Sequence, residues 1–212
     1  HCYLYVYQKK GEETMKVQLE KIKDEIVGLR PVYTDTGNAT LIYLRQGEAV
    51  DPRGLRAVLA ALARIYAVDM GAQRSQLETA LQRQGMMPFY LGPERVFVPL
   101  KMRRALAERD AVYGYVDVRC MEEASACGSR GCRLRLLDGR EIEILSSRAT
   151  VEQCRTMGCK LLEMLRQEKG ADPQEKMMVG AVLHVHQMFR VLERRLIHIE
   201  EMIAAEGESR YG

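Results

Sequence analysis

The strongest hydrophobic pattern in the chain lies close to its C-terminal end. From Met178 to Ile203, apolar residues recur with alternating spacings of four and three, as in the a and d positions of a heptad repeat. The pattern predicts a helix over residues 177–205 that is about 40 Å long, because an α-helix rises about 1.5 Å per residue. We expect this helix to pair with a second copy of the chain. The residues expected at the dimer interface are Val182, Val185, Phe189, Leu192, Leu196 and Ile199.

Two further helices are predicted in the first half of the chain. The apolar residues of the segment 55–66 are spaced to lie on one helix face. The preceding Asp51 and Pro52 suit the N-cap and the first helical position, since a carboxylate accepts from the free N–H groups of the first turn and proline has no N–H to satisfy. A second helix is expected over residues 71–84.

Short apolar runs on both sides of this helical pair predict strands. Gly92-Pro93 and Asp138-Gly139 are expected to join two pairs of runs into hairpins, and Asp-Gly is a strong hairpin signal because both residues tolerate positive φ. The segment 122–131, rich in small residues, is expected to form a loop. The predicted strands are residues 2–8, 39–48, 87–91, 95–100, 111–120 and the two arms of the 133–145 hairpin, and a helix is predicted over residues 150–168.

The order of these elements predicts an α+β fold: a mostly antiparallel sheet with an inserted helical pair and a long, coiled-coil-like C-terminal helix. No strand–helix alternation with a glycine-rich turn indicates a doubly wound parallel sheet. We divide the chain into an N-terminal strand and helix extension (1–30), which Pro31 ends, an α+β domain (31–168) and the heptad helix (177–205). No apolar run approaches the ~20 residues that a membrane-spanning helix needs, so we expect a cytoplasmic protein without a membrane partner.

The net charge of the 212-residue chain is +3, which by itself is too small to indicate a nucleic-acid partner. The basic residues are clustered, however, in the segment 101–109 and around the Asp138-Gly139 hairpin. Cations that project from a sheet on a loop can meet the phosphates of a duplex, and arginines can enter a narrow minor groove. The clustered residues are Lys101, Arg103, Arg104, Arg109, Arg130, Arg133, Arg135 and Arg140.

The sequence contains none of the common catalytic motifs. The P-loop, G-x-S-x-G, H-E-x-x-H and G-x-G-x-x-G patterns are absent, so we expect no enzymatic activity and assign no cofactor. The six cysteines include no C-x-x-C pair, and we assign no metal site. Cys120, Cys127 and Cys132 leave a thiol-based redox or metal sensor as an open alternative, beside the simpler interpretation of free thiols in a reducing compartment.

The features between Ala49 and Arg166 follow a specific order. A helical block with small residues before Arg74 is followed by two apolar strands ending in Val98-Pro99, by the strand AVYGYVDV, and by CRLRLLDGREIEILSSRATVEQC with its hairpin and serine-rich helix entry. In this order the segment resembles the competence transcription factor (ComK) family of bacterial regulators. The resemblance implies a transcriptional activator that binds A/T-rich promoter sites, largely through the minor groove, as a dimer or a pair of dimers. By position it also implies which residues face DNA: Arg74, Lys101, Arg103 and Arg104, with Arg109, Arg133 and Arg135 as second choices.

We therefore expect a DNA-binding transcriptional regulator that binds double-stranded DNA as a homodimer. The alternative is a non-enzymatic protein-interaction or sensor module whose C-terminal helix docks on a partner protein without DNA, and that helix is also compatible with packing on its own domain. DNA binding requires the cations of the segment 101–104 to be exposed on one surface. A scaffold tolerates them in ion pairs with carboxylates, for which the candidates are Glu78, Glu94 and Glu108.

Overall fold

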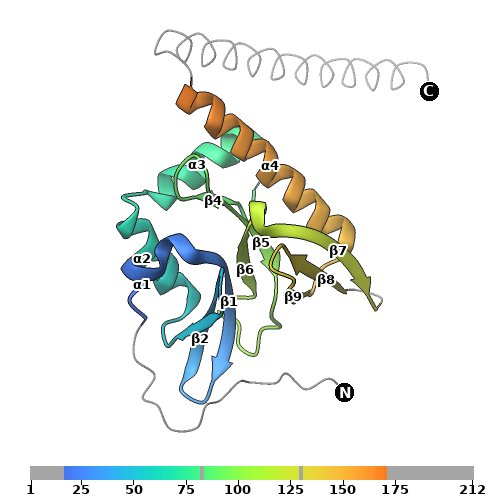
Figure 1. The fold of residues 1–212 in the computed structure, drawn as a ribbon. Coiled ribbons are helices and arrows are strands. Elements are labelled where there is room, and N and C mark those ends of the chain that lie inside the picture. The colour runs from blue at the N-terminus through green and yellow to red at the C-terminus, as the bar shows by residue number, and fades with distance from the viewer. Residues whose placement is uncertain (1–16, 82–83, 129–130, 171–212) are drawn as a thin grey trace, which may run out of the picture. The chain divides into compact units, whose positions relative to one another are not determined.

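A computed structural model describes residues 17–81, 84–128 and 131–170 (Figure 1). The strand predicted over residues 2–8 and the heptad helix predicted over residues 177–205, with all its interface residues, lie outside the described residues. Both stay predictions. Among the described residues, no helix is both long enough and apolar enough to span a membrane.

Two antiparallel sheets form the framework of the domain. The larger has six strands in the order β3-β2-β1-β6-β5-β4, and the smaller has three in the order β7-β8-β9. Every pairing between described strands is antiparallel, which confirms the predicted α+β class with a mostly antiparallel sheet. The strands are β1 (Ile26–Thr34), β2 (Gly37–Leu44), β3 (Glu48–Asp51), β4 (Phe89–Tyr90), β5 (Val96–Lys101), β6 (Tyr113–Asp117), β7 (Met121–Cys127), β8 (Gly131–Leu136) and β9 (Glu141–Ile144).

Four α-helices and two short 3-10 helices connect or cover the described strands. Asp69 caps the second long helix, since its carboxylate accepts from Gly71 N at 2.8 Å and Ala72 N at 3.0 Å. Ser147 caps the last helix by accepting from Thr150 N at 3.2 Å. The helices are α1 (Leu19–Ile22), η1 (Lys23–Glu25), α2 (Leu55–Ile65), α3 (Met70–Leu81), η2 (Val118–Cys120) and α4 (Arg148–Gly170).

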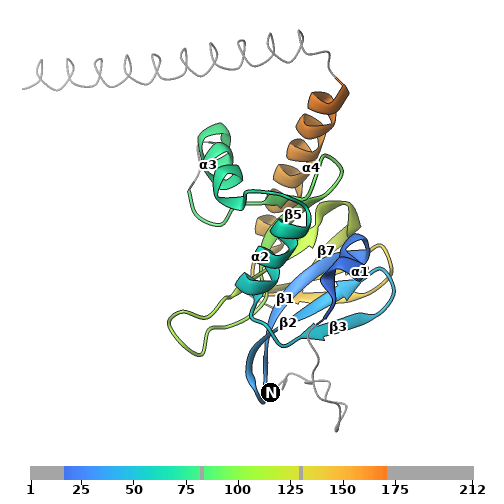
Figure 2. The ribbon, with the colours of Figure 1, turned by 90° about the vertical axis from the view of Figure 1, so that its left-hand side faces the viewer.

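Strand β5 is buried on both of its faces. Its residues Val96, Val98 and Leu100 belong to a core with α4 and the three-stranded sheet, while the alternate residue Phe97 belongs to a second core with α2. Phe97 stacks on Phe89 with ring centroids 5.0 Å apart. Figures 1 and 2 show α2 and α4 on opposite sides of the six-stranded sheet. The sheet is therefore the middle layer of the domain.

The boundary expected after residue 30 falls inside β1. This strand lies between β2 and β6 in the central sheet, so the residues from Leu19 onward belong to the domain and are not an extension. Pro31 does not end an element there. It pairs with Thr40 on β2 and lies beyond the two residues, Gly28 and Leu29, at which β1 pairs with β6, where a residue without an N–H is tolerated.

Asp51 is not the N-cap of α2. It is the last residue of β3, fully buried, and its carboxylate accepts from the backbone N of Arg53 at 2.9 Å and from the Arg53 Nε at 2.8 Å. The helix begins later, at Leu55, with Gly54 in the N-cap position. The carboxylate that was expected to cap the helix is used instead to hold the turn before it.

The segment expected to be a loop, 122–131, contains the start of β8 and all of β7 except for its first residue, Met121. Met121 and Ala124 face the core, and the polar residues between and after them are exposed. Small and polar residues have low strand propensity, but pairing with β8 and one buried face outweigh it here. The hairpin with Asp138-Gly139 at its turn is confirmed as β8 and β9.

Gly158 sets the distance between α4 and the central sheet. A Cβ at this position would lie 2.5 Å from Val98 Cγ1 on β5 and 3.1 Å from Val118 Cγ2 on η2. Helix α4 therefore approaches the sheet at a point where no side chain larger than hydrogen fits.

We expect Gly158→Ala to destabilise the protein by about 1–3 kcal/mol through overpacking, although an alanine in an unconstrained helix would stabilise it by about 1 kcal/mol. Thermal and urea unfolding measure this change, and Thr156→Ala on the exposed side of α4 is the control. Adding Val98→Ala removes the clashing methyl group, so the double variant should lose less stability than the sum of the two single variants. Additive losses would contradict the contact.

Candidate functional site

The segment that joins β5 to β6, residues 102–112, is the structural counterpart of the predicted basic connector, and we call it the arginine loop. Figures 1 and 2 show it extending from the end of the six-stranded sheet, beside the β1–β2 hairpin. Its two ends are joined by hydrogen bonds from Met102 N and Arg103 N to the Val112 carbonyl oxygen, at 2.9 and 3.2 Å. The loop thus leaves the sheet from a closed base.

Arg103 is buried at this base, with 8% of its surface exposed. Its guanidinium donates to the carbonyl oxygens of Val32 (3.0 Å) and Ala111 (2.9 Å) and to Asn38 Oδ1 (2.9 Å). It also lies over the ring of Tyr33, 3.9 Å from the centroid. These contacts use the charge to fasten the loop to the β1–β2 hairpin. The expectation that Arg103 faces DNA is therefore wrong.

Asp110 fixes the other half of the loop. Its Oδ2 accepts from the Tyr33 hydroxyl, from Leu106 N at 3.0 Å and from Ala107 N at 2.8 Å, while its Oδ1 accepts from Asn38 Nδ2 at 3.2 Å. The hydroxyl of Tyr33 and these N–H groups hold the pKa of Asp110 well below its ordinary value. Because that pKa is depressed, the stabilisation that ionised Asp110 gives the loop is fully present at neutral pH. It is lost only as the pH falls below about 4, towards the pKa of Asp110 in the folded protein.

The tip of the loop presents exposed side chains around this rigid frame. Arg104, Leu106, Glu108 and Arg109 are all exposed, and Leu106 exposes 80% of its surface. Within the described residues, neither Arg104 nor Arg109 forms an ion pair. Lys101, at the end of β5, is half-buried, and its carbonyl oxygen accepts from Leu145 N at 2.7 Å. The loop therefore offers two cations that form no ion pair with the described part of the domain.

Arg133 and Arg135 do not contribute to this surface charge. Both point outward from β8, but Arg135 pairs with Glu122 and Glu123 at 2.9 Å each and Arg133 pairs with Glu141 at 3.3 Å. Counting the exposed Glu143 of β9, four carboxylates surround two arginines, so the described residues of this face carry a net charge of −2. Phosphates would be repelled here, so these second-choice residues do not form a DNA-facing surface.

Arg74 lies on a different part of the domain from the arginine loop. It is exposed on α3 and pairs with Glu78 at 2.8 Å. Helix α3 is attached to β4 through Gln73, whose Nε2 donates to the Tyr90 carbonyl oxygen at 2.9 Å. Tyr90 pairs with Val96, the first residue of β5, and the arginine loop follows the last residue of the same strand. The attachment of α3 and the start of the arginine loop are therefore separated by the length of β5, roughly 17 Å.

Arg140 also has a structural role. Its guanidinium donates to the carbonyl oxygens of Leu44 and of Gly47, the latter at 2.8 Å, and pairs with Asp138. It therefore ties the β8–β9 turn to the β2–β3 turn. Arg130, the remaining member of the predicted cluster, lies outside the described residues.

The three cysteines of the sensor hypothesis are not brought together at one point, although Cys127 and Cys132 lie near one another on paired strands. Cys132 is buried on β8, Cys127 is exposed at the end of β7, and Cys120 precedes the start of β7. The length of that strand, about 20 Å, separates Cys120 from Cys127, so these thiols cannot ligate one metal ion. Among the described residues no group of three or more His, Cys, Asp and Glu side chains is placed to hold one.

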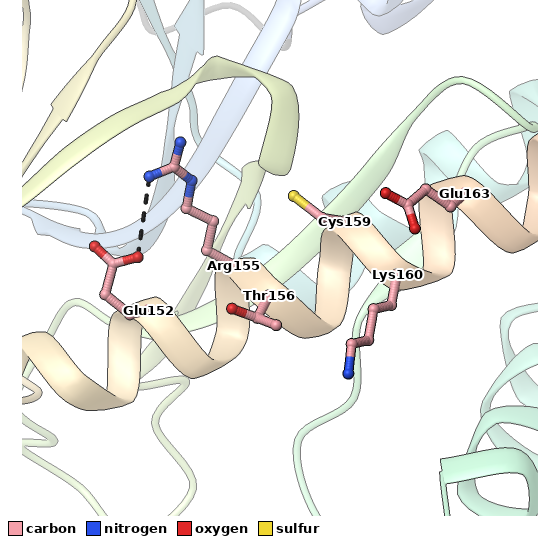
Figure 3. Close-up of a pocket in the computed structure, with 6 residues that line it drawn as sticks. All are labelled: Glu152, Arg155, Thr156, Cys159, Lys160 and Glu163. Atoms are coloured by element: carbon pink, nitrogen blue, oxygen red, sulfur yellow. Dashed lines mark ion pairs between the residues drawn. The ribbon is translucent and has the colours of Figure 1, made fainter.

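A depression of about 410 Å³ runs along the outer surface of α4 (Figure 3). All six residues that line it come from this one helix, and Arg155 and Glu152 approach to 3.9 Å across one turn. Along the helix two bases, Arg155 and Lys160, lie between two acids, Glu152 and Glu163, and no other element contributes a side chain. We assign it no chemistry. Its residues are Glu152, Arg155, Thr156, Cys159, Lys160 and Glu163.

Comparison of the chain with family models, with curated proteins and with solved structures finds no match. The geometry of the arginine loop is therefore the basis for a function. Sequence reasoning identified the segment but missed the residues that hold it, because Tyr33, Asn38 and Asp110 come from separate parts of the chain. It also missed Leu106, whose signal was a single large apolar residue among charged ones.

We expect Asp110→Ala to release the arginine loop without unfolding the domain. The N–H groups of Leu106 and Ala107 lose their carboxylate acceptor, so their hydrogen exchange should accelerate to the rate of an unprotected loop, while exchange in β5 and β6 stays slow. Hydrogen-exchange mass spectrometry or NMR measures both. Glu108→Ala, which removes an exposed carboxylate from the same loop, is the control. Unchanged exchange at Leu106 and Ala107 would refute the anchoring role of Asp110.

Proposed function

We propose that the protein is a cytoplasmic DNA-binding transcriptional regulator that binds A/T-rich sites through the minor groove as a homodimer. The observation that carries the proposal is the arginine loop, in which Arg104 and Arg109 are exposed on a frame fixed by Arg103 and Asp110. The resemblance of residues 49–166 to the competence transcription factor family supports the same function.

A fixed loop with unpaired cations suits phosphate binding for two reasons. Each cation that meets a phosphate releases condensed counterions, and here no intramolecular ion pair with a described residue has to be broken first. The backbone of the loop is already ordered, so binding costs less conformational entropy than it would for a mobile arm. A narrow A/T-rich minor groove has an enhanced negative potential, so it attracts arginine more strongly than an average minor groove does.

A single arginine loop offers few phosphate contacts, so useful affinity requires a second copy. If the heptad seam of residues 177–205 joins two chains, binding of the first loop raises the effective concentration of the second. We therefore propose Lys101, Arg104 and Arg109 as the DNA-facing residues of each copy. Dimerisation through Val182, Val185, Phe189, Leu192, Leu196 and Ile199 stays part of the proposal.

We expect the double variant Arg104→Ala/Arg109→Ala to weaken binding to an A/T-rich duplex. In fluorescence anisotropy titrations at several salt concentrations, the slope of log K against log salt should fall in magnitude by about 1.8 per loop, because two phosphate contacts are lost. The wild-type protein should bind the A/T-rich duplex more tightly than a G/C-rich one of equal length.

Arg56→Ala/Arg64→Ala is the matched control, since it removes two exposed arginines from α2. It lowers the net charge equally and should leave the salt slope unchanged. An equal loss in both double variants would mean that net charge and not the loop drives binding, and would contradict the proposal.

We expect Leu192→Glu to weaken DNA binding without altering the arginine loop. A charged residue in the heptad seam disfavours pairing of the two helices, so the second loop loses its high effective concentration. Analytical ultracentrifugation measures the oligomeric state and anisotropy measures the affinity. Wild-type DNA affinity in a demonstrably monomeric variant would show that dimerisation and DNA binding are not coupled.

A protein-interaction module is the second candidate function. It is favoured by the roles of the other basic residues: Arg103 is buried, and Arg74, Arg133 and Arg135 pair with glutamates. The same titration separates the two functions. Absence of binding to any duplex at low salt would leave docking of the C-terminal helix on a partner protein as the function to pursue.

A further inference from the structure

Leu106 is a large apolar side chain held at the tip of a polar loop. It exposes 80% of its surface, more than the other exposed large apolar residues of the described part of the chain, which are Met86, Leu137 and Met164. Leaving a leucine in water gives up the stabilisation that burial would provide. A mobile loop could fold such a side chain against the domain, but this loop is not free to do so.

The backbone of Leu106 is fixed in position. Its N–H is shared between the Tyr33 hydroxyl at 2.9 Å and Asp110 Oδ2 at 3.0 Å, and the next residue, Ala107, donates to the same carboxylate oxygen. The chain then turns, with Asp110 N donating to the Ala107 carbonyl oxygen at 3.1 Å. The same contacts that order the loop therefore hold Leu106 away from the core.

Leu106 is also flanked by two arginines that pair with no described carboxylate. Arg104 lies two residues before it and Arg109 three residues after it, and both are exposed. Glu108 is the exposed carboxylate of the tip, so the tip keeps a net positive charge of one. An apolar side chain between cations matches a duplex in which phosphates line both edges of a groove and the stacked faces of the base pairs are apolar.

We propose that Leu106 is a wedge that enters the minor groove and inserts between two base pairs, while Arg104 and Arg109 contact the phosphates on either side. Minor-groove proteins use leucine and similar side chains in this way, partly unstacking one base step and bending the duplex by about 20–90°. The pyrimidine–purine steps of A/T-rich DNA, above all TA, unstack most easily. The wedge rests on the proposed DNA binding and adds a source of preference that phosphate contacts lack.

The test uses the full chain and A/T-rich duplexes that carry 2-aminopurine at successive positions, since the fluorescence of this base rises when it unstacks. A second duplex with donor and acceptor dyes at its ends measures bending. We expect the wild-type protein to raise the fluorescence at one TA step and to shorten the end-to-end distance. Leu106→Ala should abolish both signals, lower the affinity by less than about tenfold, and keep the salt slope, because the arginine contacts remain.

Leu137→Ala is the matched control, since Leu137 is 67% exposed at the β8–β9 turn and should give wild-type signals. Leu106→Met keeps an apolar wedge and should retain unstacking. Binding by the wild type without unstacking, or unstacking that persists in Leu106→Ala, would overturn the wedge and leave the DNA-binding proposal intact. No binding by the wild type to any duplex would overturn both.

Discussion

Strand β5 packs against two hydrophobic cores, one on each of its faces, and this double packing constrains most of the domain. Val96, Val98 and Leu100 face α4 and the three-stranded sheet, whereas Phe97 faces α2. A strand buried on both faces cannot shift its register by one residue without exchanging the contents of the two cores. Its antiparallel partner β6 is fixed with it, and the absence of a side chain at Gly158 lets α4 close the core that contains Val98. The two ends of the arginine loop are therefore attached to the most constrained part of the sheet.

The arginine loop is held in place because Arg103 and Asp110 form hydrogen bonds inside the fold, whereas the surface arginines of β8 form ion pairs with carboxylates. Among the described residues no carboxylate pairs with Arg103. Its guanidinium donates to two carbonyl oxygens and an amide oxygen, and it lies over the ring of Tyr33. Asp110 in turn collects hydroxyl and N–H donors from both sides of the loop. Both networks connect the loop to the β1–β2 hairpin, so residues more than 70 positions apart in the sequence hold one another. Removing either charge leaves donors or acceptors of the other partner unsatisfied.

The sequence predicted those elements whose signals are local. The apolar stripe of α2, the Asp138-Gly139 turn and the closing helix α4 each depend on spacing within one segment, and each is found in the structure. It failed where tertiary contacts decide. Strand β7 has a polar outer face that resembles a loop, and Asp51 resembles an N-cap until its burial beside Arg53 is known. Arg103 and Arg104 are adjacent and chemically identical, and nothing local distinguishes the buried one from the exposed one.

That distinction changes what the proposed DNA binding requires. Counted along the sequence, the basic residues suggest an extended phosphate-binding face. In the fold, four members of the predicted cluster are held by carboxylates or carbonyl oxygens: Arg103, Arg133, Arg135 and Arg140. Arg104 and Arg109, which pair with no described carboxylate, lie on the arginine loop. With so few phosphate contacts the proposed DNA binding would be weak, and contacts to phosphate do not distinguish one base sequence from another. A regulator built this way needs repetition of the loop, which the heptad helix would supply, and a feature that senses the bases. The fixed, exposed Leu106 between two arginines meets the second requirement because the cost of unstacking depends on the base step into which it inserts.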